Sequence, residues 1–357
     1  MTSLFTPLAA GALRLPNRIV MAPMTRSRAD DLGVVGTLTA RYYAQRASAG
    51  LIISEGIYPE PMGKGYVRTP GLADAKQVAA WRSVTDAVHA AGGRIVAQLM
   101  HAGRISDPSL LPDGATPVAP SAVRPNGGTW LDSGLQPHVT PRALATSEIL
   151  EILDNYAAAA RRALDAGFDG VELHAGNGYL PMQFLSTNTN LRTDAFGGNA
   201  RNRARFTIEA LEAIASEVGA ERTSLKITPG KTFNDIHDVD PESTYTSLLA
   251  AIRPMQLAFV EVAPDPVPVV PHARLRTLLD GAYLAGSSFD RDSGARALAQ
   301  GEADAIVYGQ LFIANPDLPR RFAHGAPLAK ADPATFYAGG ARGYVDYPAL
   351  AEPMAAE

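Results

Sequence analysis

A turn that follows a short apolar strand carries three polar side chains with complementary chemistry, His174, Asn177 and Tyr179. Residues 170–174 alternate apolar and polar side chains, which is typical of a strand with one buried face, and two glycines then break the strand. His174 and Asn177 can hold an oxygen atom through hydrogen bonds, and the Tyr179 phenol can release a proton. From these residues alone, a buried structural histidine followed by a polar turn is an equally good interpretation.

The composition of the chain limits the classes of function that these three residues could have. The chain has 357 residues, enough for one large α/β barrel or two ordinary domains. Its net charge of −4 and the lack of a basic stripe argue against nucleic acid or an anionic membrane as a partner. The absence of cysteine excludes disulfides, cysteine–zinc sites and a thiol nucleophile, and we assign no metal ligand. No run approaches a membrane span and the first 18 residues do not resemble a signal peptide, so we expect a cytoplasmic protein.

Eight short apolar runs recur along the chain, and helical stretches separate them. They are Arg18–Met21, Leu51–Ser54, Arg94–Leu99, Gly170–His174, Ser224–Thr228, Leu257–Val262, Ala282–Gly286 and Ala305–Tyr308. Before the fourth run, Ile149, Ile152 and Tyr156 recur at helical spacing, with Thr146 or Ser147 able to cap the helix. Eightfold strand–helix alternation predicts an α/β fold, a single (β/α)8 TIM barrel over residues 1–357. A doubly wound open sheet is the alternative, but no G-x-G-x-x-G follows a strand.

One connection is much longer than the others. Residues 101–146, after the third strand, are rich in proline and glycine. Loops of this length are typically functional lids or disordered segments, and a barrel carries its site on the face from which this loop leaves. We therefore expect a lid-like insertion over the catalytic face, with a small hairpin around Asn126-Gly127-Gly128.

Polar residues on the predicted strands should face the barrel interior, because the apolar faces meet the helices. Glu172 and Lys226 lie on adjacent strands, and we expect them to pair, since a buried charge needs a partner. A purely structural ion pair is the simpler interpretation of these two residues. The glycine-containing ends of strands seven and eight are the usual phosphate position in this fold, although glycine ends many strands for steric reasons alone.

Ten motifs occur in order on the predicted elements: Asn17–Arg26, Tyr42–Ala47, Gly50–Glu55, Gly167–Leu180, Gln183–Ser186, Arg192–Asp194, Gly197-Gly198, Phe312–Pro319, Gly343-Tyr344 and Asp346–Pro348. Through these motifs the chain resembles the flavin-dependent ene-reductases of the old yellow enzyme family over nearly its whole length. The resemblance implies an NAD(P)H-dependent flavoenzyme that reduces the activated C=C bond of an α,β-unsaturated carbonyl or nitro compound. NADPH or NADH would supply the hydride, and a monomer or a homo-oligomer is equally compatible.

The same resemblance implies roles for individual residues. Non-covalent FMN would lie across the barrel mouth, with its phosphate on the backbone N–H groups of Gly286 and Ser287. The implied cofactor-binding residues are Pro23, Met24, Thr25, Gly56, Gln98, Lys226, Gly286, Ser287, Gly309 and Gln310. His174 and Asn177 would hold the substrate oxygen, Tyr179 would protonate the substrate, and Tyr66 and Tyr344 would wall the pocket.

Two positions depart from the family pattern. Lys226 and Gln310 stand where the family usually has arginine, and both changes are expected to weaken FMN binding or alter flavin reactivity, because lysine loses the planar fork and glutamine the charge. They keep a second function open, a flavin-binding barrel with redirected chemistry, such as an isomerase or a biosynthetic specialist. A third possibility is a flavin-free lyase or hydrolase that uses Glu172, Lys226 or His174.

Overall fold

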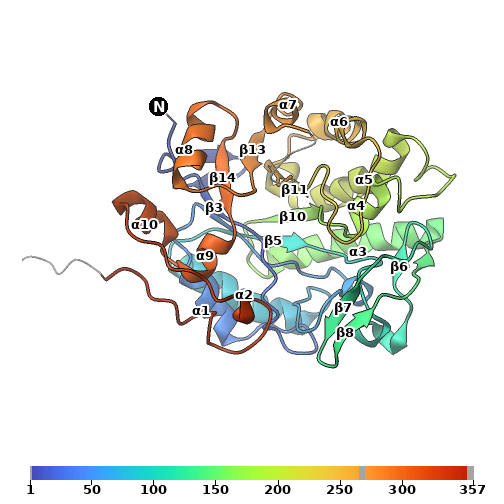
Figure 1. The fold of residues 1–357 in the computed structure, drawn as a ribbon, viewed down its shortest axis with the longest axis horizontal. Helices are drawn as coiled ribbons and strands as arrows, with labels where there is room; N and C mark the ends of the chain where they lie inside the picture. The colour runs from blue at the N-terminus through green and yellow to red at the C-terminus, as the bar shows by residue number, and fades with distance from the viewer. Residues whose placement is uncertain (1, 265–269, 352–357) are drawn as a thin grey trace, which may run out of the picture.

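The computed structural model describes residues 2–264 and 270–351, and its centre is a closed barrel of eight parallel strands (Figure 1). In barrel order the strands are β10 (Gly170–Ala175), β11 (Thr223–Ile227), β12 (Phe259–Val262), β13 (Ala282–Ala285), β14 (Ala305–Tyr308), β3 (Ile19–Met21), β4 (Leu51–Ile53) and β5 (Ile95–Leu99). Each of the eight predicted runs contains or overlaps one of these strands, so the predicted TIM-barrel fold is confirmed.

Helices cover the outside of the barrel. They are α1 (Thr37–Ala44), α2 (Ala75–Ala90), α3 (Thr146–Asp165), α4 (Leu180–Leu185), α5 (Ala200–Val218), α6 (Pro241–Ile252), α7 (His272–Arg276), α8 (Arg291–Ala299), α9 (Gln310–Ala314) and α10 (Leu318–His324). The predicted stripe of α3 is buried at Ile149, Ile152 and Tyr156, but the predicted cap is wrong. Glu148 accepts the Ala145 N–H at 2.8 Å, so α3 already includes Thr146 and Ser147.

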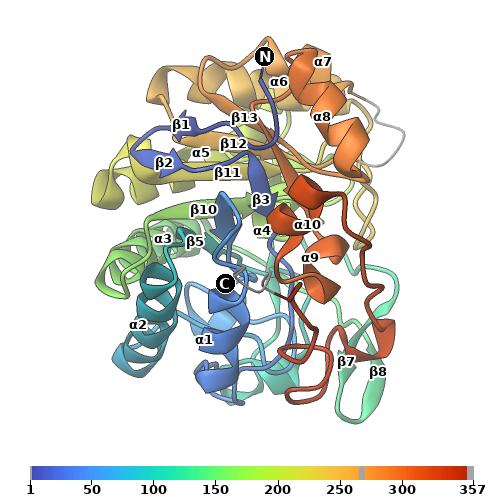
Figure 2. The ribbon, with the colours of Figure 1, turned by 90° about the vertical axis from the view of Figure 1, so that its left-hand side faces the viewer.

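A hairpin closes the N-terminal end of the barrel. Strands β1 (Leu8–Ala10) and β2 (Leu13–Leu15) pair antiparallel, and their apolar side chains pack with barrel-lining residues such as Val20, Phe259 and Leu284. Because this end is filled with apolar side chains, polar chemistry is left to the opposite end, where the strands finish. Figure 2 shows this hairpin and the hairpin of the insertion on opposite sides of the molecule.

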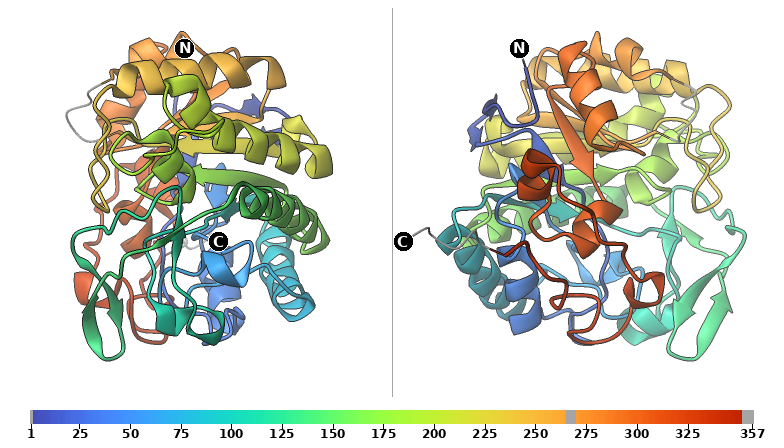
Figure 3. Two further views of the ribbon diagram at one scale, coloured as in Figure 1. Left: turned by 90° about the vertical axis from the view of Figure 1, so that its right-hand side faces the viewer. Right: turned by 60° about the vertical axis from the view of Figure 1, so that its left-hand side comes forward.

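The segment 101–146 carries its own small elements. Strands β6 (Val118–Ala119) and β9 (Arg142–Ala143) pair parallel, and β7 (Gly128–Leu131) and β8 (Gly134–Pro137) form an antiparallel hairpin. The hairpin expected around Asn126-Gly127-Gly128 is therefore present, but it begins at Gly128 and turns at residues 132–133. The segment 126–128 leads into β7. Figure 3 shows the hairpin beside the C-terminal segment around Pro333–Thr335.

Ion pairs and hydrogen bonds attach this insertion to two loops that follow barrel strands. The Arg68 guanidinium pairs with Asp132 at 2.9 Å, and Asn126 donates its backbone N–H to Asp235 at 3.1 Å. Within the described residues, no helix has the length and apolarity needed to cross a membrane.

The start of α2 offers a test of how the sequence determines the helical layer. Asp74 accepts the N–H groups of Lys76 and Gln77 at 2.8 and 2.9 Å, which satisfies two donors that have no partner inside the helix. Asp74→Ala should lower the free energy of unfolding by about 1 kcal/mol, whereas Asp74→Ser should retain most of it. Urea unfolding followed by circular dichroism measures both, and equal losses in the two variants would contradict the capping role.

Candidate active site

His174 lies near the end of β10 with its side chain buried. The Gly176 N–H donates to His174 Nδ1 at 3.3 Å, so a neutral ring carries its proton on Nε2. Burial lowers the pKa of His174 well below its usual range, and the charges of Lys226 and Lys231 add to this effect. His174 is therefore a neutral hydrogen-bond donor near physiological pH, and it can hold an oxygen atom without carrying a charge.

Asn177 occupies the turn after β10 in a left-handed conformation, with φ of 53°. Its backbone N–H donates to Thr228 Oγ1 at 2.8 Å, and its carbonyl accepts Asn234 Nδ2 at 2.8 Å. These two bonds fix the turn from both sides. Asn177 Oδ1 is buried and has no hydrogen-bond partner among the described residues, so the carboxamide is free to bind a ligand.

Tyr179 and Tyr66 share a hydrogen bond between their hydroxyl groups, at 3.0 Å. The Tyr179 ring also meets the His174 ring edge to face, with centroids 5.0 Å apart. Burial raises the pKa of Tyr179 well above its usual range, and the neighbouring Tyr66 raises it further. Tyr179 is therefore protonated at neutral pH, and the structure brings together four of the predicted residues: His174, Asn177, Tyr179 and Tyr66.

Asn234 is a residue that sequence reasoning missed. It lies in the loop after β11 with φ of 62°, and besides its bond to Asn177 its side chain makes hydrogen bonds that oppose the rise in the pKa of Tyr66 and Tyr179. Buried Arg104 holds this loop through the carbonyls of Asn234 and Asp235, at 3.1 and 2.8 Å. The sequence Asn234-Asp235 indicated a tight turn, since both residue types tolerate a left-handed conformation, but it did not indicate which residues the Asn234 side chain would contact.

Polar side chains fill the barrel beneath His174, and the predicted Glu172–Lys226 pair is wrong. Lys226 Nζ donates to Glu261 at 2.6 Å, and Gln98 Nε2 donates to Glu172 at 2.8 Å. The strand register is the cause: Lys226 lies opposite Glu261 on one side and His174 on the other, whereas Glu172 aligns with Gln98. Burial, and then the charge of Glu261, raise the pKa of Glu172 well above its usual range.

The predicted cofactor residues surround the same end of the barrel. Pro23, Met24 and Thr25 follow β3 and are half-buried, and Gly56 follows β4. An added Cβ on Gly56 would lie only 2.7 Å from Met100 Sδ, so a side chain there would require Met100 to move. Gly309 and Gln310 follow β14, with Gln310 exposed.

The phosphate prediction needs a correction. The Gly286 N–H already donates to Val262 at 2.8 Å, so it cannot bind an anion as predicted. The next residue, Ser287, is exposed with φ of 119°, and its N–H makes no hydrogen bond to the described residues. One donor of the predicted pair is therefore left.

Tyr344 is not brought to the Tyr66–Tyr179 pair. Its ring is fully buried and stacks on Tyr42, with centroids 4.2 Å apart, and the Arg28 guanidinium lies 4.5 Å from its ring centroid. Within the described residues, this places Tyr344 in a cation–aromatic cluster that fixes the C-terminal segment.

The residues that follow β3 and β4 hold this segment through Arg26 and Glu55. Buried Arg26 donates to the carbonyls of Phe336 and Gly343 at 3.1 and 3.0 Å, and its own N–H donates to Glu55 at 3.1 Å. Burial raises the pKa of Glu55 to about 7, against the opposing effect of its hydrogen bond from Arg26. The sequence analysis did not predict the hydrogen bond between Arg26 and Glu55, although the two residues lie in the motifs Asn17–Arg26 and Gly50–Glu55.

A closed barrel with a neutral histidine, a free carboxamide and a protonated tyrosine at its open end has the layout of a barrel oxidoreductase. Comparison with known proteins agrees. The chain belongs to the NADH:flavin oxidoreductase / NADH oxidase family, whose model matches residues 3–329.

The relatives include a probable flavin mononucleotide-dependent alkene reductase of Leishmania infantum, 43% identical over 96% of each chain. 12-Oxophytodienoate reductase 1 of Oryza sativa subsp. japonica is 39% identical over 98% of this chain and 93% of the relative. Among solved structures, morphinone reductase in complex with tetrahydroNAD matches with a TM-score of 0.96 and 44% identity over 100% of both chains.

The raised pKa of Glu55 predicts a pH dependence of stability. In the unfolded chain this carboxyl ionises near 4.5 and in the folded chain near 7, so the folded state holds the extra proton between these values. Its contribution to stability is complete below about pH 4.5 and is lost as pH rises through 7, by about 3 kcal/mol in all. Glu55→Gln should remove this slope in urea unfolding curves, and Glu242→Gln, at an exposed carboxylate, should keep it. A parent-like slope in Glu55→Gln would contradict the prediction.

Proposed function

We propose that this flavoprotein reduces the activated C=C bond of α,β-unsaturated carbonyl or nitro compounds. The observation that carries the proposal is a buried neutral donor, His174, whose ring lies 5.0 Å from the ring of the protonated Tyr179, with the unpartnered Asn177 Oδ1 in the turn between these two residues. FMN, when bound, accepts a hydride from NADH or NADPH and transfers it to the alkene. The residues of this chain then have two tasks, to polarise the substrate and to protonate it.

Hydride addition to a conjugated alkene moves charge onto the oxygen of the activating group. We assign the hydrogen bonds to that oxygen to His174 Nε2–H and the Asn177 carboxamide, and these bonds would strengthen as the charge appears. Because His174 is buried and neutral, it holds the oxygen without transferring a proton to it. Tyr179 acts as the general acid at carbon, with Tyr66 holding its hydroxyl.

The same clamp suits the nicotinamide. A carboxamide offers a carbonyl oxygen and an N–H group side by side, which match the His174 donor and the unpartnered Asn177 Oδ1. The binding of tetrahydroNAD by morphinone reductase supports a shared site used in turn by the two substrates.

The cofactor-binding roles remain proposals. Pro23, Met24, Thr25 and Gly56 would line the flavin, and Lys226 and Gln98 would face it from the barrel interior. Gly309, Gln310 and the Ser287 N–H would hold its phosphate. The fit is supported by the Ser287 N–H, which has no partner among the described residues, and by a lysine buried next to His174 in the barrel. The Glu261 carboxylate balances the Lys226 charge, so we expect weaker binding of an anionic flavin than a free arginine would give.

We further propose that residues 1–357 form one FMN-binding domain with segment 101–146 as its lid. One hydrophobic cluster runs from Leu4 to Val345, and the insertion is bonded to the loops that carry Tyr66 and Asn234. A cytoplasmic location, a monomeric or homo-oligomeric state and the wall role of Tyr344 stay predictions.

The balanced charge of Lys226 keeps a second function in view, an isomerase or biosynthetic specialist that binds flavin but has lost net reduction. Oxidation of NADPH driven by an added enone separates the two, because an isomerase consumes no nicotinamide. Membership of a flavin oxidoreductase family argues against the flavin-free lyase or hydrolase.

Removal of the clamp should slow the enone half-reaction. We expect His174→Ala and Asn177→Ala each to raise the barrier by about 2–4 kcal/mol, as for other oxyanion donors, and flavin reduction by nicotinamide to slow as well. Stopped-flow absorbance at the flavin band measures both steps, with the Asp74→Ser variant as a control outside the site. Enone reduction at the parent rate in the double variant would show that the assignment is wrong.

Loss of the Tyr179 hydroxyl should affect the two half-reactions unequally. Tyr179→Phe keeps the ring but removes the proton donor, so flavin reduction by NADPH should be retained and the enone step slowed. A nitroalkene, whose hydride adduct is a stable anion, should lose much less rate than a cyclic enone. Asp74→Ser, outside the site, is the control and should leave both half-reactions at the parent rate. Parent rates with both substrates in Tyr179→Phe would assign the proton to another donor.

A further inference from the structure

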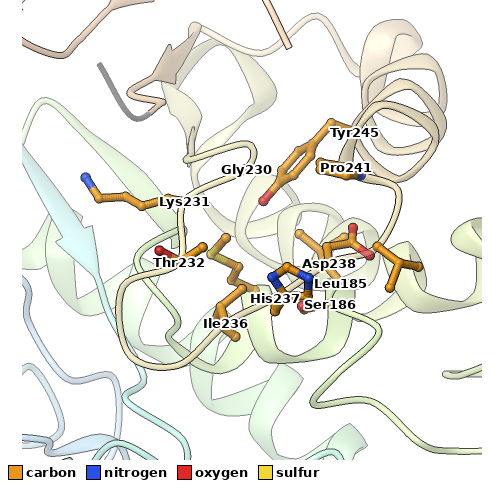
Figure 4. Close-up of a pocket in the computed structure, with 12 residues that line it drawn as sticks. Leu185, Ser186, Gly230, Lys231, Thr232, Ile236, His237, Asp238, Pro241 and Tyr245 are labelled. Atoms are coloured by element: carbon orange, nitrogen blue, oxygen red, sulfur yellow. The ribbon is translucent and has the colours of Figure 1, made fainter. Parts of the chain in front are cut away.

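A cavity of about 480 Å³ lies outside the barrel mouth, between α4, α6 and the loop 228–240 (Figure 4). Its apolar walls come from Met182, Leu185, Ile236, Val239 and Pro241. It is large enough for a small organic molecule, since ligand pockets in proteins typically measure about 300–1,000 Å³.

Two polar groups on this cavity have no hydrogen-bond partner among the described residues. They are both carboxylate oxygens of Asp238 and the hydroxyl of Tyr245. The Asp238 side chain is only 7% exposed, and Tyr245 is 1% exposed. A buried polar group without a partner is destabilising, so a ligand that makes hydrogen bonds to Asp238 and Tyr245 would bind favourably.

The nearest cation does not meet this need. Arg203 Nη2 lies 3.8 Å from Asp238 Oδ1, beyond hydrogen-bond range, and its guanidinium already donates to Leu185, Gly198 and Thr244 at 2.6–2.7 Å. Arg203 offsets the charge of Asp238 but offers it no proton. The Lys231 side chain, drawn on the same cavity, extends away from Asp238 (Figure 4).

The cavity is separate from the proposed site but shares a wall with it. Met182 Sδ lines the cavity and accepts hydrogen bonds from the Gly178 N–H at 3.2 Å and from Thr228 Oγ1 at 3.5 Å. Thr228 Oγ1 also accepts the N–H of Asn177. A molecule in the cavity would therefore press on the rear of the turn that carries Asn177.

We propose that this cavity is a second binding site, for a small amphipathic molecule with an apolar body and a hydrogen-bond-donating head, a hydroxyl or an ammonium group. The head binds Asp238 and Tyr245, and the body packs between Met182 and Val239. An anionic head is disfavoured, because it would face the Asp238 carboxylate. The site is independent of the reaction proposed above.

Three probes with one body test this assignment: 4-phenylbutylamine, 4-phenylbutan-1-ol and 4-phenylbutanoate, titrated calorimetrically into the FMN-loaded protein. We expect saturable binding of the amine and the alcohol, and at least tenfold weaker binding of the carboxylate. Asp238→Asn should weaken the amine at least tenfold, and Tyr245→Phe should weaken the alcohol about fivefold.

Two control variants test whether the probe binds in this cavity or in the barrel mouth. Glu242→Gln makes the same charge change at an exposed carboxylate of α6 and should leave all affinities unchanged. Tyr179→Phe, in the mouth, should also leave them unchanged. The proposal fails if none of the probes binds saturably, if the Asp238 and Tyr245 variants bind like the parent, or if Tyr179→Phe alone weakens the amine.

Discussion

The buried ion pair between Lys226 and Glu261 constrains the whole site. Two charges inside a barrel are stable there only because their atoms lie 2.6 Å apart on neighbouring strands. The register of β11 also sets Lys226 opposite His174, so a positive charge lies on the strand next to the imidazole. Burial, and then that charge, lower the pKa of His174 and keep the ring neutral. The proposed role of His174 as a neutral donor therefore depends on burial first and on this ion pair second.

A second layer of contacts holds the turn above this pair. Buried Arg104 donates to carbonyls of the insertion and of the loop after β11. That loop places Asn234 against the backbone of Asn177. Since Arg104 and Val123 both lie in the insertion after β5 and Asn234 follows β11, two connections are fixed relative to one another. The bond from the Asn126 N–H to Asp235 joins the same two connections.

The sequence predicted what depends on local pattern. The strands were recognisable because apolar runs alternate with helical stretches, and the set His174, Asn177 and Tyr179 was recognisable because its members lie within six residues. The Glu172–Lys226 pair failed because adjacency of strands does not give their register, and the register selects Glu261 and Gln98 instead. The prediction that the Gly286 N–H binds phosphate failed for a related reason, since this N–H donates to Val262 on the neighbouring strand. Asn234 could not be found, because its target is 57 residues away.

The hydrogen bond between Tyr66 and Tyr179 has a direction that the proposed chemistry determines. If Tyr179 donated to Tyr66, its proton would point away from the substrate and the acid would be blocked. The proposed reaction therefore requires Tyr66 to donate and Tyr179 to present its own proton to the substrate carbon. Once that proton had left, the phenolate oxygen of Tyr179 would accept bonds from Tyr66 and from the Asn234 side chain. Burial disfavours this anion strongly, so under the proposed mechanism the Tyr66 hydroxyl, 3.0 Å from the acid, would stabilise it until it is reprotonated.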